Sequence, residues 1–132
     1  MANDKSAARP LSPHLQIYRP MLTMMMSIMH RITGVGLYFG IILLVWWLTA
    51  ASVSDGYYDF AQGFFGHWFG RLLLFGFTWA LIHHALGGLR HLLWDTGRGF
   101  DLRLVEWLAR ANLAGSIVLT LLLWVIGYGV MA

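Results

Sequence analysis

The 132-residue chain has no cysteine, and only 11% of its residues are charged. Without cysteine the chain cannot form disulfides, hold a thiolate-bound iron–sulfur cluster, attach a cofactor through Cys-x-x-Cys-His or use a catalytic thiol. A soluble domain usually carries about 25% charged residues. Because 58% of the residues are hydrophobic, one small core cannot bury the apolar surface, and we expect lipid to solvate part of the chain.

Formal charge is absent from three long stretches, 32–54, 72–89 and 111–132. With its flanks, each stretch reaches the roughly 20 residues that a helix needs to cross a bilayer. The runs are continuous and lack the alternation of a membrane barrel. The sequence therefore predicts an all-α membrane protein with transmembrane helices at about 23–51, 67–94 and 107–130, and it predicts a loop over 52–66.

The net charge of +3 comes from eight arginines and one lysine. In so apolar a chain this balance indicates membrane orientation and not nucleic-acid binding. Most of the basic residues precede the first predicted helix or flank the second loop: Lys5, Arg9, Arg19, Arg98, Arg103 and Arg110. The first loop carries Asp55 and Asp59 instead. We expect a bacterial inner-membrane protein with a cytoplasmic N-terminus and a periplasmic C-terminus.

The second predicted helix carries ionisable side chains inside its apolar stretch. At about 100° per residue, His84, Gly88, His91 and Asp95 form one stripe along the helix. His83 lies about 100° round from that stripe. Ionisable residues at membrane depth indicate a partner, a cofactor or water. A neutral imidazole is a good axial ligand for haem iron, and the neighbouring glycine leaves space for a flat ligand.

The first predicted helix begins with a second polar cluster. Ser27, His30, Arg31 and Gly34 are spaced to share one helix face. In the expected orientation this cluster and His84 lie at a similar depth near the cytoplasm. An arginine there is suited to bind the anionic propionates of a haem.

Other interpretations of these residues stay open at this point. A single membrane histidine is more often an interhelical hydrogen-bond partner or a surface anchor than a ligand, and we place His14 and His67 in that class. Asp95 can pair with an arginine at the membrane interface. A chain of histidines can also serve as a relay in a non-redox subunit that conducts protons or ions. After Arg110 the third predicted helix has no charged residue or histidine to complete such a path.

Three segments resemble the signatures of one known family, the cytochrome b subunits of succinate dehydrogenase, or respiratory complex II. They are residues 9–18 (RPLSPHLQIY), 27–34 (SIMHRITG) and 84–95 (HALGGLRHLLWD). Their Ser-Pro-His start and Trp-Asp ending resemble the mitochondrial and alphaproteobacterial branch. The resemblance covers the chain in length, span number and motif placement, while the third helix matches only in being apolar.

This resemblance implies roles for individual residues. His84 is the expected axial ligand of haem b, and His83 is the competing candidate. We prefer His84 because it shares its stripe with Gly88 and His91. The resemblance further implies propionate contacts from His30, Arg31 and His91, and a ubiquinone site lined by Ser27 and Arg31.

The resemblance also implies partners. A second small membrane anchor subunit supplies the other axial ligand and the other half of the helical bundle. A flavoprotein and an iron–sulfur subunit pass electrons from succinate to ubiquinone, which links the tricarboxylic acid cycle to the respiratory chain. Residues 1–22 are expected to dock the iron–sulfur subunit, and residues 23–132 form the transmembrane cytochrome b domain. The chain is then not catalytic alone; the alternatives are a fumarate reductase anchor or a non-redox ion-conducting subunit.

Overall fold

The computed structural model describes residues 17–131 and contains four helices. They are α1 (Leu22–Val53), α2 (Asp55–Gly66), α3 (Trp68–Asp95) and α4 (Leu102–Met131). The three long helices are each long and apolar enough to cross a membrane. Helices α1 and α3 begin and end within two residues of the predicted positions. The described residues contain no strand, so the predicted all-α membrane fold is confirmed.

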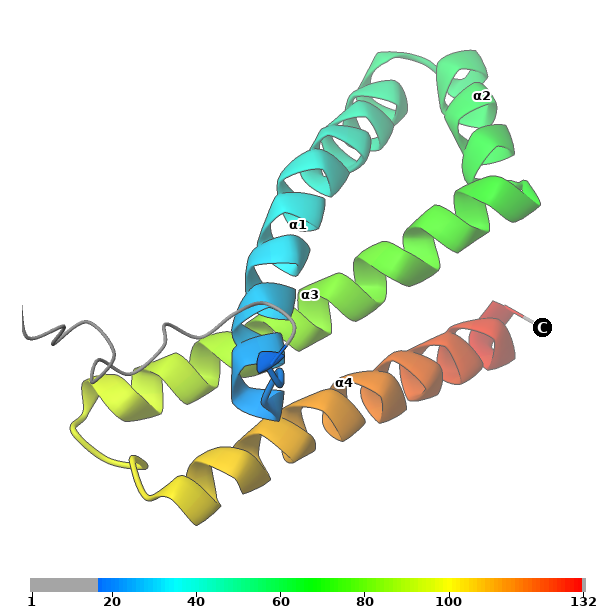
Figure 1. The fold of residues 1–132 in the computed structure, drawn as a ribbon. Coiled ribbons are helices and arrows are strands. Elements are labelled where there is room, and N and C mark those ends of the chain that lie inside the picture. Colours follow the sequence, from blue (N-terminus) through cyan, green and yellow to red (C-terminus); the bar gives the residue numbers. More distant parts are fainter. Residues whose placement is uncertain (1–16, 132) are drawn as a thin grey trace, which may run out of the picture.

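The helices are arranged as a triangle with one helix added beside it (Figure 1). α1 crosses α3, α2 joins their far ends, and α4 lies antiparallel beside α3. Two interhelical contacts at different heights join α3 to α4: Ser116 lies by His83, and Trp124 Nε1 donates to Thr78 Oγ1 over 3.4 Å. We call the end of the molecule that carries α2 the α2 end.

The prediction of a loop over 52–66 is wrong, because most of this segment is α2. Ser54 caps the helix by accepting a hydrogen bond from the backbone N–H of Tyr57 over 3.3 Å. Aromatic residues of α2 pack on the last turns of α1, where Trp46 Nε1 donates to the Tyr57 hydroxyl over 2.8 Å. Acidic and glycine residues gave the segment the composition of a loop, whereas its aromatic face makes it an amphipathic helix suited to a membrane interface.

Helix α4 begins at Leu102, five residues earlier than position 107, where the prediction placed its start. The Asp101 carboxylate accepts a hydrogen bond from the Leu104 N–H over 3.1 Å and caps the helix. The connection from α3 uses Gly97 and Gly99, whose φ angles of 75° and 81° favour glycine. The predicted start was set from the apolar span with its flank, but a capped polar turn extends the helix beyond that span.

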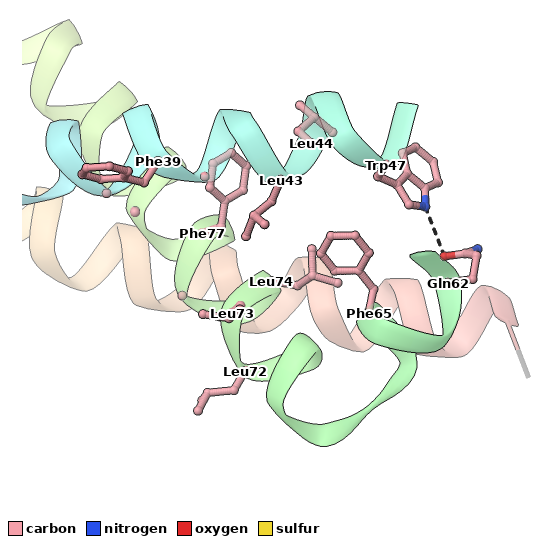
Figure 2. A pocket seen from close by; sticks show the side chains of 14 residues that line it. Phe39, Leu43, Leu44, Trp47, Gln62, Phe65, Leu72, Leu73, Leu74 and Phe77 are labelled. Atoms are coloured by element: carbon pink, nitrogen blue, oxygen red, sulfur yellow. Dashed lines mark hydrogen bonds between the residues drawn. The ribbon is translucent and has the colours of Figure 1, made fainter. Parts of the chain in front are cut away.

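An apolar cavity of about 570 Å³ lies between α1, α2 and α3 near the α2 end (Figure 2). Its walls are aliphatic and aromatic, and its polar edge is Gln62, whose side-chain oxygen accepts a hydrogen bond from Trp47 over 3.2 Å. Toward the crossing of α1 and α3 the Phe77 ring packs directly on Gly40. The polar residues of interest thus lie beyond Phe77, in the other half of the molecule.

Candidate functional site

Three histidines from two helices meet where α1 crosses α3. The His30 ring of α1 stacks on the His84 ring of α3, with centroids 3.9 Å apart and planes inclined by 7°. The His91 ring lies 5.1 Å from His30 and is exposed at the edge of the cluster. The structure therefore brings together three of the residues that the sequence proposed for cofactor binding.

Two glycines let the helices approach closely enough for this contact. A Cβ atom at Gly87 would lie 2.6 Å from His30 Nδ1, and one at Gly34 would lie 3.1 Å from His84 Cε1. Any larger residue at position 87 would push His30 away from α3. Gly88, in contrast, has nothing within 4 Å of its missing Cβ, so the predicted open space beside His84 is present.

The hydrogen bonds of His84 determine which ring nitrogen is available. His84 Nδ1 lies 3.1 Å from the backbone oxygen of His30 and 3.3 Å from the hydroxyl of Thr33. A carbonyl oxygen only accepts, so Nδ1 carries the proton and donates. Nε2 then has a lone pair, and no residue in the range 17–131 hydrogen-bonds to it. A backbone carbonyl commonly fixes the tautomer of a metal-binding histidine in this way.

The neighbouring His83 lies about 100° round α3 from His84, faces α4 and is only 1% exposed. Its Nδ1 lies 3.2 Å from the Ser116 hydroxyl and 3.2 Å from the Asn112 amide nitrogen, both on α4. Trp79 covers part of the ring. Burial and polar partners from its own chain give His83 the role of an interhelical contact, so the two adjacent histidines have different environments.

The four residues predicted to share one face of α1 divide into two groups in the structure. His30 and Gly34 face α3, whereas Ser27 and Arg31 are exposed. The Arg31 Nε donates to the backbone oxygen of Ser27 over 3.4 Å. The two exposed side chains are one helical turn apart and leave their polar groups accessible to a ligand from outside this chain.

A buried arginine also lies near this end of α3. Arg90 is 7% exposed, and its guanidinium lies 5.2 Å from the centre of the Trp94 ring. No hydrogen-bond partner for its Nε lies within residues 17–131. Asp95 is exposed, and the structure shows no ion pair between it and an arginine of the described segment. His14 lies outside the described residues, and His67 caps α3 by accepting from the Phe69 N–H over 3.5 Å.

The sequence analysis missed the residues that orient the histidines: Thr33, Gly87, Asn112 and Ser116. On α4 a signal was present, because small and polar residues recur every three to four positions at Ala109, Asn112, Ser116 and Thr120, all of which are buried. Such a stripe is typical of helix–helix contacts in membranes. For Thr33 and Gly87 the relevant partner is on another helix, and the sequence alone gives no register for it.

The chain matches the family model described as the succinate dehydrogenase/fumarate reductase transmembrane subunit over residues 5–123. It is 46% identical over 122 residues to the succinate dehydrogenase cytochrome b556 subunit of Paracoccus denitrificans, covering 92% of this chain and 94% of that protein. The cytochrome b556 subunit of Rickettsia conorii is 39% identical over 117 residues, covering 89% of this chain and 91% of that protein.

Similarity extends to a mitochondrial protein. The mitochondrial succinate dehydrogenase cytochrome b560 subunit of Sus scrofa is 38% identical over 98 residues, covering 71% of this chain and 57% of the porcine protein. The expected resemblance to the mitochondrial and alphaproteobacterial branch is confirmed. This chain belongs to the family of transmembrane subunits of succinate dehydrogenase and fumarate reductase.

Proposed function

We propose that this chain is the haem b-binding membrane anchor of a succinate:ubiquinone oxidoreductase, with His84 as its axial ligand. One observation carries the assignment: His84 Nδ1 donates to the His30 carbonyl, which leaves Nε2 as a lone-pair donor. The similar proteins from Paracoccus and Rickettsia are named cytochrome b556 subunits of succinate dehydrogenase, which supports both the haem and the complex.

The residues around His84 fit a haem. Iron in a cytochrome b is held by neutral imidazole nitrogen, and His84 offers one on a helix face where Gly88 leaves open space. His83 fits less well, because its ring is buried and its Nδ1 contacts two residues of α4. The preference for His84 over His83 therefore has support from contacts that the sequence did not reveal.

The other polar residues of the cluster suit the charged edge of the cofactor. We assign propionate contacts to His30 and His91, whose rings form the cluster with His84, and to Arg31, which follows His30 on α1. A propionate is an acceptor, and the exposed Arg31 guanidinium makes the stronger, charge-assisted hydrogen bonds with such groups. A bound haem supplies a one-electron carrier within the membrane.

Ser27 and Arg31 are the proposed quinone-binding residues. Both are exposed and lie one turn apart on α1. The Ser27 hydroxyl can donate to a quinone carbonyl oxygen, and Arg31 can stabilise the negative charge that develops on the ring oxygens during reduction. Their polar groups therefore suit a neutral quinone that gains electrons and protons at the membrane surface.

The proposal includes a second small anchor subunit, an iron–sulfur subunit and a flavoprotein. One chain supplies one available axial imidazole, so the second axial ligand comes from the other anchor. The large apolar side chains exposed along all three long helices leave ample surface for that anchor and for lipid. We assign the docking of the iron–sulfur subunit to residues 1–22, of which 1–16 lie outside the described part of the structure.

We place the α2 end in the periplasm and the α3–α4 connection in the cytoplasm of a bacterial inner membrane. Asp55 and Asp59 lie on α2, whereas Arg98 lies in the α3–α4 connection and Arg103 in the first turn of α4, as the positive-inside rule requires. Arg71, in the first turn of α3, is the exception, since it lies at the α2 end. A single arginine at the α2 end does not outweigh the several arginines at the other end, so the charge distribution keeps the same direction.

The test compares two matched variants, His84→Gln and His83→Gln, in the complete complex purified from membranes. A glutamine keeps hydrogen-bonding groups but is a poor haem ligand. We expect the reduced-minus-oxidised spectrum to lose the cytochrome b band in His84→Gln and to retain it in His83→Gln. The reverse pattern would transfer the ligand assignment to His83. A wild-type complex that contains flavin and iron–sulfur clusters but no haem would overturn the proposal.

A further inference from the structure

Two adjacent histidines on one helix present a selection problem. Neighbouring residues point about 100° apart, so a rotation of α3 by one residue would bring His83 to the position that His84 now occupies. Either imidazole has the chemistry of an axial ligand. Something in the structure must therefore hold one histidine away from the cofactor, and the residues around His83 are suited to do so.

The polar partners of His83 are all buried in the contact between α3 and α4. Ser116 Oγ lies 3.2 Å from His83 Nδ1, and the Asn112 amide nitrogen lies 3.2 Å from the same atom. The Asn112 amide also donates to the His83 backbone oxygen over 3.4 Å. Asn112 thus contacts both the ring and the backbone of one residue, so its position fixes the rotation of α3 as well as that side chain.

A rotation of α3 would break these contacts within the membrane. There the freed Asn112 amide would find no water to replace the imidazole, and the Ser116 hydroxyl would keep only its hydrogen bond to the Leu113 backbone oxygen. The residues that flank them in the α4 stripe offer no ionisable substitute, since Ala109 and Thr120 are neutral and Thr120 donates to the Ser116 backbone oxygen. The polar pair therefore favours a single rotational position of α3.

We infer that Asn112 and Ser116 are positioning residues that capture His83 and thereby leave His84 as the histidine that faces the cofactor. This inference rests on the proposed function, because it assumes that His84 binds haem. It assigns a cofactor-related role to α4, the helix that carries no ligand. Asn112 and Ser116 act through α3 and contact neither the haem nor its ligand.

The test uses the holo complex with the double substitution Asn112→Leu/Ser116→Ala. We expect the low-spin haem signal in electron paramagnetic resonance to shift or split, and the haem midpoint potential to shift. The haem content per flavin is also expected to fall. The single variant Ser116→Ala should give a smaller shift in the same direction, so the inference stays testable if the double variant assembles poorly. Ser116→Thr keeps the hydroxyl and should restore the wild-type signal.

The matched control is Thr78→Val, which removes a hydrogen bond between α3 and α4 that does not involve His83. Thr78 accepts from Trp124 Nε1 at the α2 end, about two helical turns from His84. We expect this variant to lower thermal stability and to leave the haem signal and potential unchanged. A double variant with the wild-type haem signal and potential would overturn the inference, as would equal spectral changes in Thr78→Val. A wild-type complex without haem would overturn the proposed function instead.

Discussion

The imidazole rings of His30 and His84 lie face to face, 3.9 Å apart and nearly parallel, at the crossing of α1 and α3. The backbone oxygen of His30 also accepts a hydrogen bond from His84 Nδ1 over 3.1 Å. Residue 30 therefore contacts His84 through its side chain and its main chain together. Four substitution experiments follow from this arrangement and from the helices around it.

Substitutions at Gly87 and Gly88 distinguish the effect of helix packing from the effect of the space left for the cofactor. Gly87→Val places a side chain against His30 Nδ1 and forces α1 away from α3, with a cost of about 1–3 kcal/mol in stability. A Cβ atom at Gly88 would have no neighbour within 4 Å among the described residues, so Gly88→Leu should preserve stability while reducing haem content. Thermal denaturation and haem content per flavin measure the two effects. Equal losses of stability in both variants would contradict the assignment.

Thr33→Val tests how the proposed axial ligand, His84, is held in place. The substitution keeps the volume of the buried side chain and removes the hydroxyl that lies 3.3 Å from His84 Nδ1. The carbonyl of His30 still accepts from that nitrogen, so we expect haem to be retained. The lost hydrogen bond corresponds to about 0.5–1.5 kcal/mol, and it should appear as a shift in the haem midpoint potential. An unchanged potential would show that the carbonyl alone orients the ring.

Ser27→Ala and Arg31→Leu test the quinone site. We expect the KM for ubiquinone to rise by roughly tenfold or more in Arg31→Leu, since a charged hydrogen bond contributes about 1.5–3 kcal/mol, and by less in Ser27→Ala. Electron transfer from succinate to a soluble dye should be unaffected, because it bypasses the quinone. Arg103→Leu, which removes the same charge from an exposed position on α4, is the control. A similar KM change in this control would indicate a general electrostatic effect.

Single cysteines test the orientation, because the natural chain has none. Asp59→Cys on α2 and Arg98→Cys between α3 and α4 are both at exposed positions. A membrane-impermeant maleimide should label Asp59→Cys in intact spheroplasts and Arg98→Cys in inverted vesicles. The opposite labelling pattern would reverse the proposed topology.

The spans were predictable because each one is a continuous property of the sequence: charge stops at Arg31 and resumes at Asp55, and similar gaps define the other two. The polar face of α3 was predictable for the same reason, since His84 and His91 are two turns apart on one helix. Helix α2 was not predictable, because the residues that stabilise it as a helix pack against Trp46 on another helix. The division of Ser27 and Arg31 from His30 also depends on where α3 crosses α1.

The different roles of His83 and His84 were only partly predictable from the sequence. Nothing in their immediate sequence distinguishes the two histidines, and the preference for His84 rested on its sharing a helix face with Gly88 and His91. The contacts that support it come from Asn112 and Ser116 on α4, whose spacing is visible in the sequence but whose partner is not. A single sequence does not show which residues of two packed helices face each other.

Helix α2 has a consequence for the order of assembly. Its 12 residues form a helix about 18 Å long at the usual rise per residue. Helix α2 spaces the ends of α1 and α3 at the α2 end, while the stacked imidazoles and their glycines hold the other halves of the two helices close together. The opening angle between these two helices is therefore a property of the isolated polypeptide. A newly inserted chain would offer the same preshaped angle to the proposed haem and to the proposed second anchor, whichever arrives first.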